Sequence, residues 1–321
     1  MNLEHNMDQI HVKLTIMREF AIIHYMGTSK PIQERLKALK AEFDRLRVGK
    51  DALLHLIDEA EVTESVYNSN AIENSTLTLP ETEKILLEME LSRRVNLREV
   101  FEAKNLARVI SYMCSKSKDT DISKDLILLL HKMLMGNIND PVAGRFRGKN
   151  EYVRVGTFIA PAPEHVERMI ENALVEYSSG HDMYFVDTIS IFHLEFETIH
   201  PFNDGNGRIG RMIINWQLTR LGFPSIIIRE KEKQVYYRGF VEYRDDKKIR
   251  SMDRLIALAV MESLHKRIAY LKGLQIVNLT DFAKTSDKPI PAILNAARRQ
   301  TIPAFREKGV WKIGDGKTVE P

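Results

Sequence analysis

The stretch around which this chain is organised is His200-Pro201-Phe202-Asn203-Asp204-Gly205-Asn206-Gly207-Arg208-Ile209-Gly210-Arg211. Apolar residues at helical spacing run up to it and away from it, which predicts a helix on each side. The two glycines around the asparagine allow positive φ angles that turn backbone N–H groups inward. Those groups would lie at the start of the second helix, where the helix dipole favours an anion.

Four side chains of this turn carry or can carry charge. Asp204 is placed to bind a divalent cation through its carboxylate. Arg208 and Arg211 are three residues apart, so they share a face of the second helix. His200 titrates near neutral pH. The residues alone therefore predict a phosphate and metal site with a histidine beside it, and they leave the role of the histidine open.

Composition sets broad limits. The 321 residues are 44% hydrophobic and 28% charged, and the net charge of +3 points to no particular partner. The single cysteine, Cys114, excludes an intramolecular disulfide framework and fits a reducing compartment; its apolar helical context predicts a buried, inert thiol. No secretory pattern and no run of 18 apolar residues occurs, so we expect a cytoplasmic protein without a membrane span.

Helical patterns account for most of the chain, which predicts a mainly α-helical fold. They cover residues 8–25, 32–48, 97–116, 123–136, 163–176, 187–199, 232–243 and 253–271. A further helical pattern starts near Glu64 and breaks after Asn74. Ser69 and Glu73 lie one turn apart on it and share a face, although a lone glutamate near a helix end is usually a solvated charge. Pro80, followed by acidic residues, predicts the start of the next helix.

Two other segments have open interpretations. Residues 141–162 carry β-branched and aromatic residues with period two between Gly and Pro, which predicts a short hairpin. It could be a surface loop or an edge that receives an extended peptide. Tyr236 and Tyr237 could be core aromatics or could stack on a base.

The C-terminal residues 273–321 differ from the rest. After a boundary near Gly273, two short helices and a Gly-tipped hairpin follow the layout of a winged helix. Over 272–321, nine Lys or Arg stand against five Asp or Glu, a net charge of +4. DNA contact is one interpretation, with Arg298 and Arg299 on the second helix. Protein docking or dimerisation is the other.

The central stretch fits the pattern HPFx(D/E)GNGRxxR throughout, and in this it resembles the Fic family of AMP-transferases. Residues 141–163 resemble the family's flap hairpin. The run Ser69-x-x-x-Glu73-Asn74 is similar to the inhibitory motif (S/T)xxxE(G/N) of the class with a built-in inhibitory helix, here at about 62–74. The resemblance covers about residues 60–270. It implies an N-terminal helical region (1–115), a Fic helical core with a β-hairpin flap (116–271) and a C-terminal winged-helix-like module (273–321).

The resemblance also implies roles. His200 would be the general base, Asp204 would hold Mg²⁺, and Arg208 with Arg211 would bind the phosphates of ATP. Arg244 is a departure, since relatives carry asparagine there, and it affects the nucleoside pocket. The implied nucleotide-binding residues are Val155, Gly156, Thr157, Phe158, Asp204, Gly205, Asn206, Gly207, Arg208, Ile209, Gly210, Arg211, Tyr236 and Tyr237.

By the same resemblance, Glu73, with Ser69 and Asn74, would inhibit the enzyme by pairing with Arg211. The implied activity is transfer of AMP from ATP to a Ser, Thr or Tyr hydroxyl of a protein, with a homodimer as one assembly. Alternatives are removal of AMP from a modified protein, transfer of another nucleotide, a DNA-binding regulator that uses residues 273–321, and an inactive scaffold. The complete central motif disfavours the scaffold.

Overall fold

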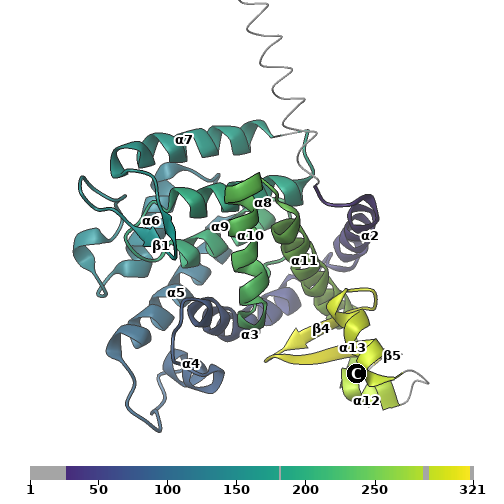
Figure 1. The fold of residues 1–321 in the computed structure, drawn as a ribbon. Coiled ribbons are helices and arrows are strands. Elements are labelled where there is room, and N and C mark those ends of the chain that lie inside the picture. Colours follow the sequence, from purple (N-terminus) through teal and green to yellow (C-terminus); the bar gives the residue numbers. More distant parts are fainter. Residues whose placement is uncertain (1–26, 181, 285–288, 319–321) are drawn as a thin grey trace, which may run out of the picture.

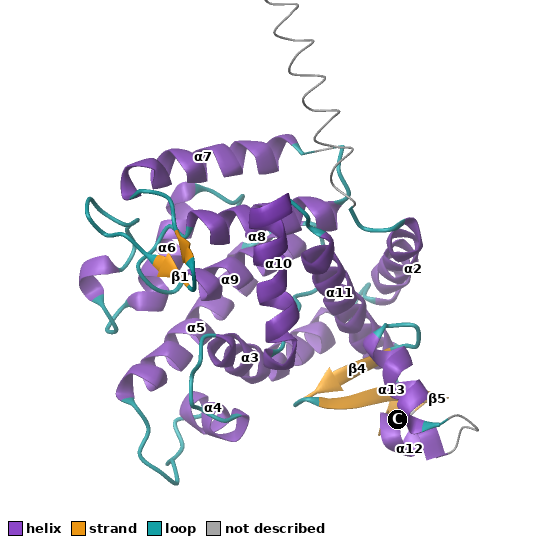
Figure 2. Ribbon diagram, viewed as in Figure 1, coloured by secondary structure: helices purple, strands orange, loops and turns teal. Residues whose placement is uncertain are grey.

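The computed structural model describes residues 27–180, 182–284 and 289–318. The chain is mainly helical, with two small sheets (Figures 1 and 2). The predicted helix at 8–25 lies outside the described residues. The described helices are α2 (Lys30–Leu46), α3 (Asp51–Ile72), α4 (Leu79–Leu86), α5 (Leu97–Lys116), α6 (Lys124–Met135), α7 (Pro163–Ser179), α8 (Phe185–Ile199), α9 (Asn206–Arg220), α10 (Lys233–Asp246), α11 (Arg250–Leu271), α12 (Leu279–Lys284) and α13 (Ile290–Arg298), with short 3₁₀ turns η1 (Asp140–Val142) and η2 (Glu230–Glu232).

Local capping explains where several helices begin. Thr78 and Glu81 form a reciprocal capping box at the start of α4, with a proline in its first turn as the sequence predicts. The side chain of Asn96 caps α5, and that of Ser123 caps α6. The predicted helices at 97–116 and 123–136 are therefore confirmed nearly to the residue.

Helices α8 and α9 pack against each other at the centre of the molecule (Figure 1). Helix α8 also packs on α7, α10 and α11, and α9 packs on α3, α5 and α6. Phe196 on α8 and Trp216 on α9 are fully buried in a core shared with α5 and α6. Leu194 and Ile214 of the same two helices are buried in a second core shared with α2, α10 and α11. Because both cores hold α8 and α9, the loop between them has a rigid support on two sides.

The predicted hairpin in residues 141–162 is present but small. Strand β1 (Arg154–Val155) pairs antiparallel with β2 (Phe158–Ile159). Gly156 takes a φ of +60° in the turn between them, a conformation that glycine adopts without strain.

The C-terminal residues add a strand that the sequence patterns did not predict. Leu274–Asn278 form β3, where we predicted only a boundary near Gly273, and the sheet order is β3-β5-β4 with β4 (Ala304–Glu307) and β5 (Val310–Thr318). A small apolar core of their own joins this sheet to α12 and α13. Strand β4 also packs on α11. A run of five residues was too short to separate strand from linker by its pattern.

Two further findings concern Cys114 and the length of the helices. Cys114 is exposed, so the prediction of a buried thiol is wrong: its position on α5 faces outward although its neighbours are apolar. Partial desolvation nevertheless raises the pKa of its thiol, which disfavours the reactive thiolate. None of the described helices combines the length and apolar character needed to cross a bilayer.

Candidate active site

The loop between α8 and α9 is held in one shape by its own side chains. His200 ends α8 in the left-handed region at φ 50° and ψ 63°, and Gly205 precedes α9 at φ 82°. The Asn206 side chain closes the loop, because its Oδ1 accepts from the Phe202 N–H at 2.9 Å and its Nδ2 donates to the Phe202 carbonyl at 2.8 Å. His131 stacks on Phe202 with ring centroids 3.7 Å apart.

The two glycines serve different purposes. Gly205 takes the predicted positive φ, whereas Gly207 lies inside α9 and is not among the residues with positive φ, so the expectation for Gly207 is wrong. A side chain at Gly207 would meet Glu73 instead, with Cβ only 2.2 Å from Oε1. Gly207 is therefore needed for a close approach between α3 and α9.

His200 is anchored by a residue that the motif did not include. Arg147, only 4% exposed, donates from Nε to the His200 carbonyl at 2.8 Å and from Nη2 to the carbonyls of Ile199 and Pro161 at 3.2 and 2.8 Å. Burial lowers the pKa of the His200 imidazole to about 4. The ring is therefore neutral at pH 7 and can accept a proton.

Asp204 is the acidic group of the loop. Its carboxylate accepts from the Gly205 N–H at 2.6 Å and from Arg208 Nη2 at 3.1 Å, and it pairs with Arg98 on α5. Burial alone would raise its pKa, but Arg208, the Gly205 N–H and Arg98 lower it. Arg208 in turn pairs with Glu102 at 3.1 Å. Arg98 and Glu102 lie about 100 residues before the motif, and nothing in their local pattern marks them.

The donor set fits a magnesium–nucleotide complex better than an all-protein metal site. Within the described residues there is no group of three or more His, Cys, Asp or Glu that could hold a metal ion. The side chain of Asp204 is 38% exposed and carries the ionised carboxylate. Mg²⁺ commonly takes one or two carboxylates and completes its shell with phosphate oxygens and water. Asp204 could supply that carboxylate if Arg98 moved aside.

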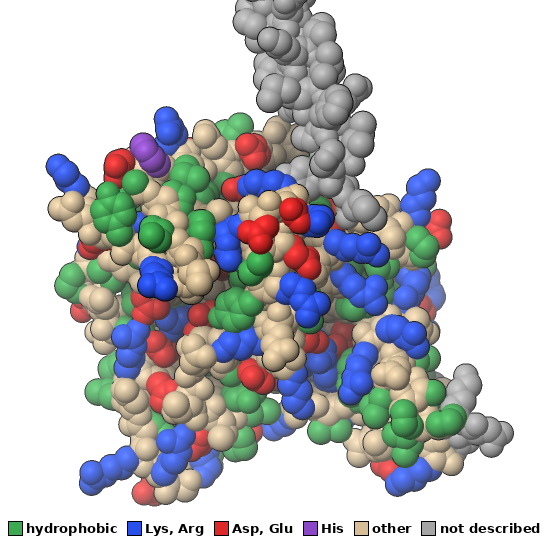
Figure 3. All heavy atoms as spheres, viewed as in Figure 1, with side chains coloured by type: hydrophobic (Ala, Val, Ile, Leu, Met, Phe, Trp, Pro, Cys, Tyr) green, Lys and Arg blue, Asp and Glu red, His purple; other side chains and the backbone are tan. Residues whose placement is uncertain are grey.

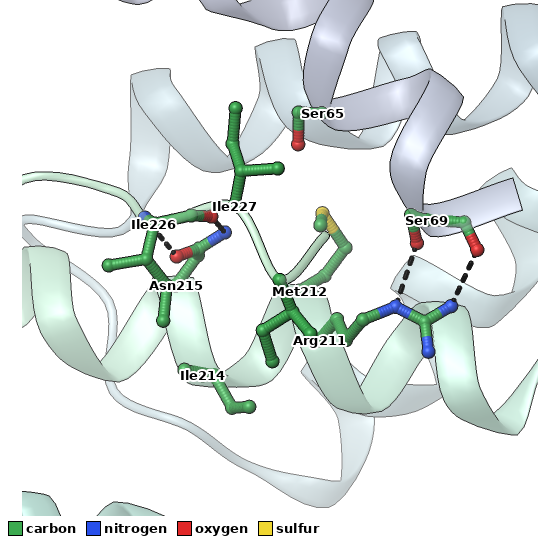
Figure 4. Close-up of a pocket in the computed structure, with 9 residues that line it drawn as sticks. Ser65, Ser69, Arg211, Met212, Ile214, Asn215, Ile226 and Ile227 are labelled. Carbon is green, nitrogen blue, oxygen red and sulfur yellow. Dashed lines mark hydrogen bonds between the residues drawn. The ribbon is translucent and has the colours of Figure 1, made fainter. Parts of the chain in front are cut away.

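Arg211 points away from the loop, toward α3. Its Nε donates to Ser69 Oγ at 3.0 Å, and its Nη2 donates to the Ser69 carbonyl at 2.8 Å and to Glu73 Oε1 at 2.9 Å. Figure 4 shows the two contacts with Ser69, beside a cavity of about 10 Å³. A cavity of that size has room for one water at most. Arg211 is 4% exposed, and its guanidinium is bound mainly by the end of α3, with a longer hydrogen bond from Nη1 to the Tyr236 hydroxyl at 3.4 Å.

The remaining predicted residues are spread over three environments. Tyr237 is 37% exposed and donates to the Ile72 carbonyl at 3.3 Å, whereas Tyr236 is 1% exposed and belongs to the core. On the hairpin, Gly156 and Thr157 are exposed, and Phe158, paired with Val155, is partly buried. The Arg244 guanidinium lies 4.8 Å from the Phe158 ring centroid, so the residue that departs from the pattern contacts the hairpin.

Three other predicted residues have mainly structural surroundings. Ile209 is fully buried in the core. A Cβ at Gly210 would meet Glu197 and His193. For both positions, only the backbone could reach a nucleotide. Asn74, at φ 69°, follows the end of α3 and accepts a hydrogen bond from Lys233 at 2.7 Å.

The fold is a mainly helical domain in which charged side chains of a loop gather at the start of a buried helix. Residues 121–218 match the model of the Fic/DOC family. The match does not include α3, which carries Ser69 and Glu73.

Curated relatives point to the same family as the match over residues 121–218. The chain is 29% identical over 245 residues to protein adenylyltransferase Fic of Nematostella vectensis, covering 74% of this chain and 56% of that protein. It is 34% identical over 178 residues to protein adenylyltransferase fic-1 of Caenorhabditis elegans, covering 54% of this chain and 34% of that protein. The chain thus spans little more than half the length of the first of these curated relatives.

Solved structures agree in fold. A Fic domain-containing signaling protein from Bacteroides thetaiotaomicron superposes with a TM-score of 0.67 at 24% identity, covering 74% of this chain and 97% of that one. A Fic family protein from Desulfovibrio desulfuricans superposes with a TM-score of 0.58 at 19% identity, covering 92% of this chain and 99% of that one. At these identities the similarity concerns the fold alone.

Proposed function

We propose that this protein transfers AMP from ATP to a hydroxyl side chain of a protein, and that Glu73 keeps it in a low-activity state. The relatives named protein adenylyltransferase support the reaction class. The contact of Arg211 with Glu73 and Ser69 supports the low-activity state and is the observation that carries the proposal.

In the proposed reaction, the target hydroxyl oxygen attacks the α-phosphorus of ATP and the bond to diphosphate breaks. His200, neutral at pH 7, takes the hydroxyl proton. Arg208 and Arg211 would bind phosphate oxygens, together with the N–H groups at the start of α9. Mg²⁺ held by Asp204 would neutralise phosphate charge. The site would act mainly by positioning and charge stabilisation.

Glu73 would inhibit by occupying the phosphate-binding arginine. A hydrogen bond to a charged group is worth about 1.5–3 kcal/mol, which is roughly a 10- to 100-fold bias against ATP in its productive position. The Glu73 carboxylate, with its side chain 34% exposed, would also repel the phosphates. Both effects disappear together when the end of α3 moves away.

The test is transfer of labelled AMP to a cell lysate by four forms of the protein. Glu73→Gly should raise labelling about 10-fold or more over wild type. His200→Ala in the Glu73→Gly background should abolish it. Glu88→Gln removes the same charge at an exposed position and should behave like wild type. Unchanged labelling by Glu73→Gly with a competent target would refute autoinhibition.

The same experiment separates the alternative reactions. Labelled UTP and GTP beside ATP show which nucleotide is transferred. Loss of label from a target modified beforehand, dependent on Glu73, would favour removal of AMP as the main activity. The compartment stays a prediction, and we still expect a cytoplasmic protein.

For the C-terminal residues we propose a winged-helix module, supported by the succession of β3, α12, α13, β4 and β5. Arg298, the last residue of α13, and Arg299, which follows it, are exposed, but basic and acidic side chains are interspersed on the face shown in Figure 3. DNA binding by this module predicts affinity that falls steeply with salt and is lost on deleting 273–321. A homodimer stays a prediction that sedimentation can test.

A further inference from the structure

A buried polar group behind the catalytic loop has no part in the mechanism above. Glu197 lies on α8, one turn before His200, and is 8% exposed. Its Oε1 is buried and has no hydrogen-bond partner among the residues that the structure describes. Helix α9 comes close because residue 210 is glycine: a Cβ there would lie 2.5 Å from Glu197 Oε1.

Glu197 faces the hidden side of the imidazole. Its Oε2 lies 3.9 Å from His200 Nδ1. That nitrogen is buried inside the protein, so Nε2 is the nitrogen left to face a substrate. At this distance the carboxyl makes no hydrogen bond to the ring, but as a carboxylate it would favour a proton on the nearer nitrogen and stabilise the imidazolium.

We propose that Glu197 is a positioning residue for His200, which keeps Nε2 free for the target hydroxyl and balances the positive charge that forms on the ring. This inference rests on the proposed function. The hydroxyl proton goes to Nε2, and the resulting imidazolium, with its proton on Nδ1, faces the Glu197 carboxylate. When the AMP product leaves, Nε2 returns the proton to solvent.

The groups around Glu197 tie this role to Glu73. Burial, and after it the nearby charge of Glu73, raises the pKa of Glu197 to about 8, while Arg211 opposes the rise. With Glu73 in place, Glu197 is therefore mostly protonated at pH 7. Removal of Glu73 would favour the carboxylate, so the step that frees Arg211 would also supply the charge that His200 needs. The titratable or charged groups that face Glu197 or His200 are His193 on α8, Arg211 on α9, Glu73 after α3, Tyr236 on α10, Arg147 and Asp204.

Stability separates this role from a structural one. A buried carboxyl with an unpartnered oxygen costs free energy, and neutral replacements of buried charges are often neutral or stabilising. Glu197→Gln keeps the size and removes the charge. It should therefore melt at or above the temperature of the parent, whereas a residue that holds the helices together would melt lower.

The experiment uses the full chain in the Glu73→Gly background. Glu197→Gln should lower AMP transfer about 10-fold or more, and it should remove the rise in rate between pH 6 and 8 that follows ionisation of Glu197. The matched control is Asp253→Asn on α11, another buried carboxyl, which should leave rate and profile unchanged. An unchanged rate and profile in Glu197→Gln would overturn the inference.

A second measurement does not depend on activity. NMR titration of the Glu197 carboxyl should show a lower pKa in Glu73→Gly than in the wild type, because loss of the neighbouring anion favours the carboxylate. An unmoved Glu197 pKa, or a lower melting temperature of Glu197→Gln with an unchanged pH profile, would show that Glu197 is structural. If Glu73→Gly transfers no AMP while the Glu197 pKa moves, the proposed function fails and the electrostatic coupling stands.

Discussion

Glu64 on α3 is the residue whose loss should both destabilise the protein and loosen Glu73. It is 4% exposed and pairs with Arg229, which keeps a second partner, Glu262, at 3.0 Å. Its two oxygens also accept the N–H groups of Lys308 and Gly309, at 3.0 and 2.9 Å, from the tip of the β4–β5 hairpin. The C-terminal sheet is thus attached to the helix that ends at Glu73.

The size of the effect follows from these contacts. Breaking a buried ion pair costs about 3–5 kcal/mol, and the lower end applies because Arg229 keeps Glu262. Glu64→Gln should therefore lower the free energy of unfolding by about 3 kcal/mol. For a chain of this size that is roughly 6–12 °C in melting temperature. With its anchor weakened, the end of α3 should release Arg211 more often, so AMP labelling should rise above wild type but stay below that of Glu73→Gly.

Thermal melts and AMP labelling of the same samples, taken below the melting range, provide the assay. Glu83→Gln is the matched control, because Glu83 contacts the same hairpin through an exposed pair with Lys308 at 2.9 Å, and exposed pairs contribute little. A melting temperature equal to wild type would refute the energetic argument. Lower stability with unchanged labelling in Glu64→Gln would refute the connection to Glu73.

Three further outcomes follow from buried groups. Burial, then the charge of Asp187, raises the pKa of Asp253 to about 8. The folded state therefore keeps a proton that the unfolded state loses above pH 4, and the free energy of unfolding falls by about 1.4 kcal/mol per pH unit up to pH 8. Asp253→Asn should remove this contribution in melts from pH 5 to 8, and parallel curves for the variant and the wild type would contradict it. Gly210→Ala should cost about 1–3 kcal/mol in denaturant unfolding, because its Cβ would lie 2.5 Å from Glu197 Oε1; an unchanged midpoint would show that α8 gives way freely. Arg147→Leu should lower both melting temperature and AMP transfer, since it leaves several buried carbonyls without a donor; normal transfer would show that His200 needs no such anchor.

The parts of the site that lie close together in the sequence could be predicted from it. The turn from His200 to Arg211, the flanking helices and the hairpin all follow from local periodicity and glycine placement. The Ser69–Glu73 segment was recognised by its motif, and its contact with Arg211 at 2.9 Å agrees with that expectation. Each of these features depends on residues within about one or two turns of each other.

The parts that depend on distant partners could not be predicted. Arg98 meets Asp204 across 106 residues, and Arg147 meets His200 across 53. Most arginines of a protein lie on its surface, and nothing in the sequence around Arg98 or Arg147 distinguishes these two from the others. Glu197 shows the same limit: it interrupts the apolar pattern of α8, which marks it as unusual, but only the packing of α9 against it shows that it is buried.

Helix α3 explains how these separate observations could act together. Glu64 and Glu73 are nine residues apart, about 13 Å along one helix, with the hairpin tip at one and Arg211 at the other. If this part of α3 moves as a unit, it has two positions, one with Glu73 on Arg211 and one moved away from it. A partner that binds the C-terminal sheet can change the contact at Arg211 only if it binds one of these positions more tightly than the other. A 100-fold activation requires about 2.7 kcal/mol of such preference, comparable to the contribution of the Glu64 network. The position of α3 would then decide whether His200 can act as a base and whether Arg211 can bind phosphate. The buried carboxyls of Glu64 and Glu197, which cost stability, would connect that position to these two residues.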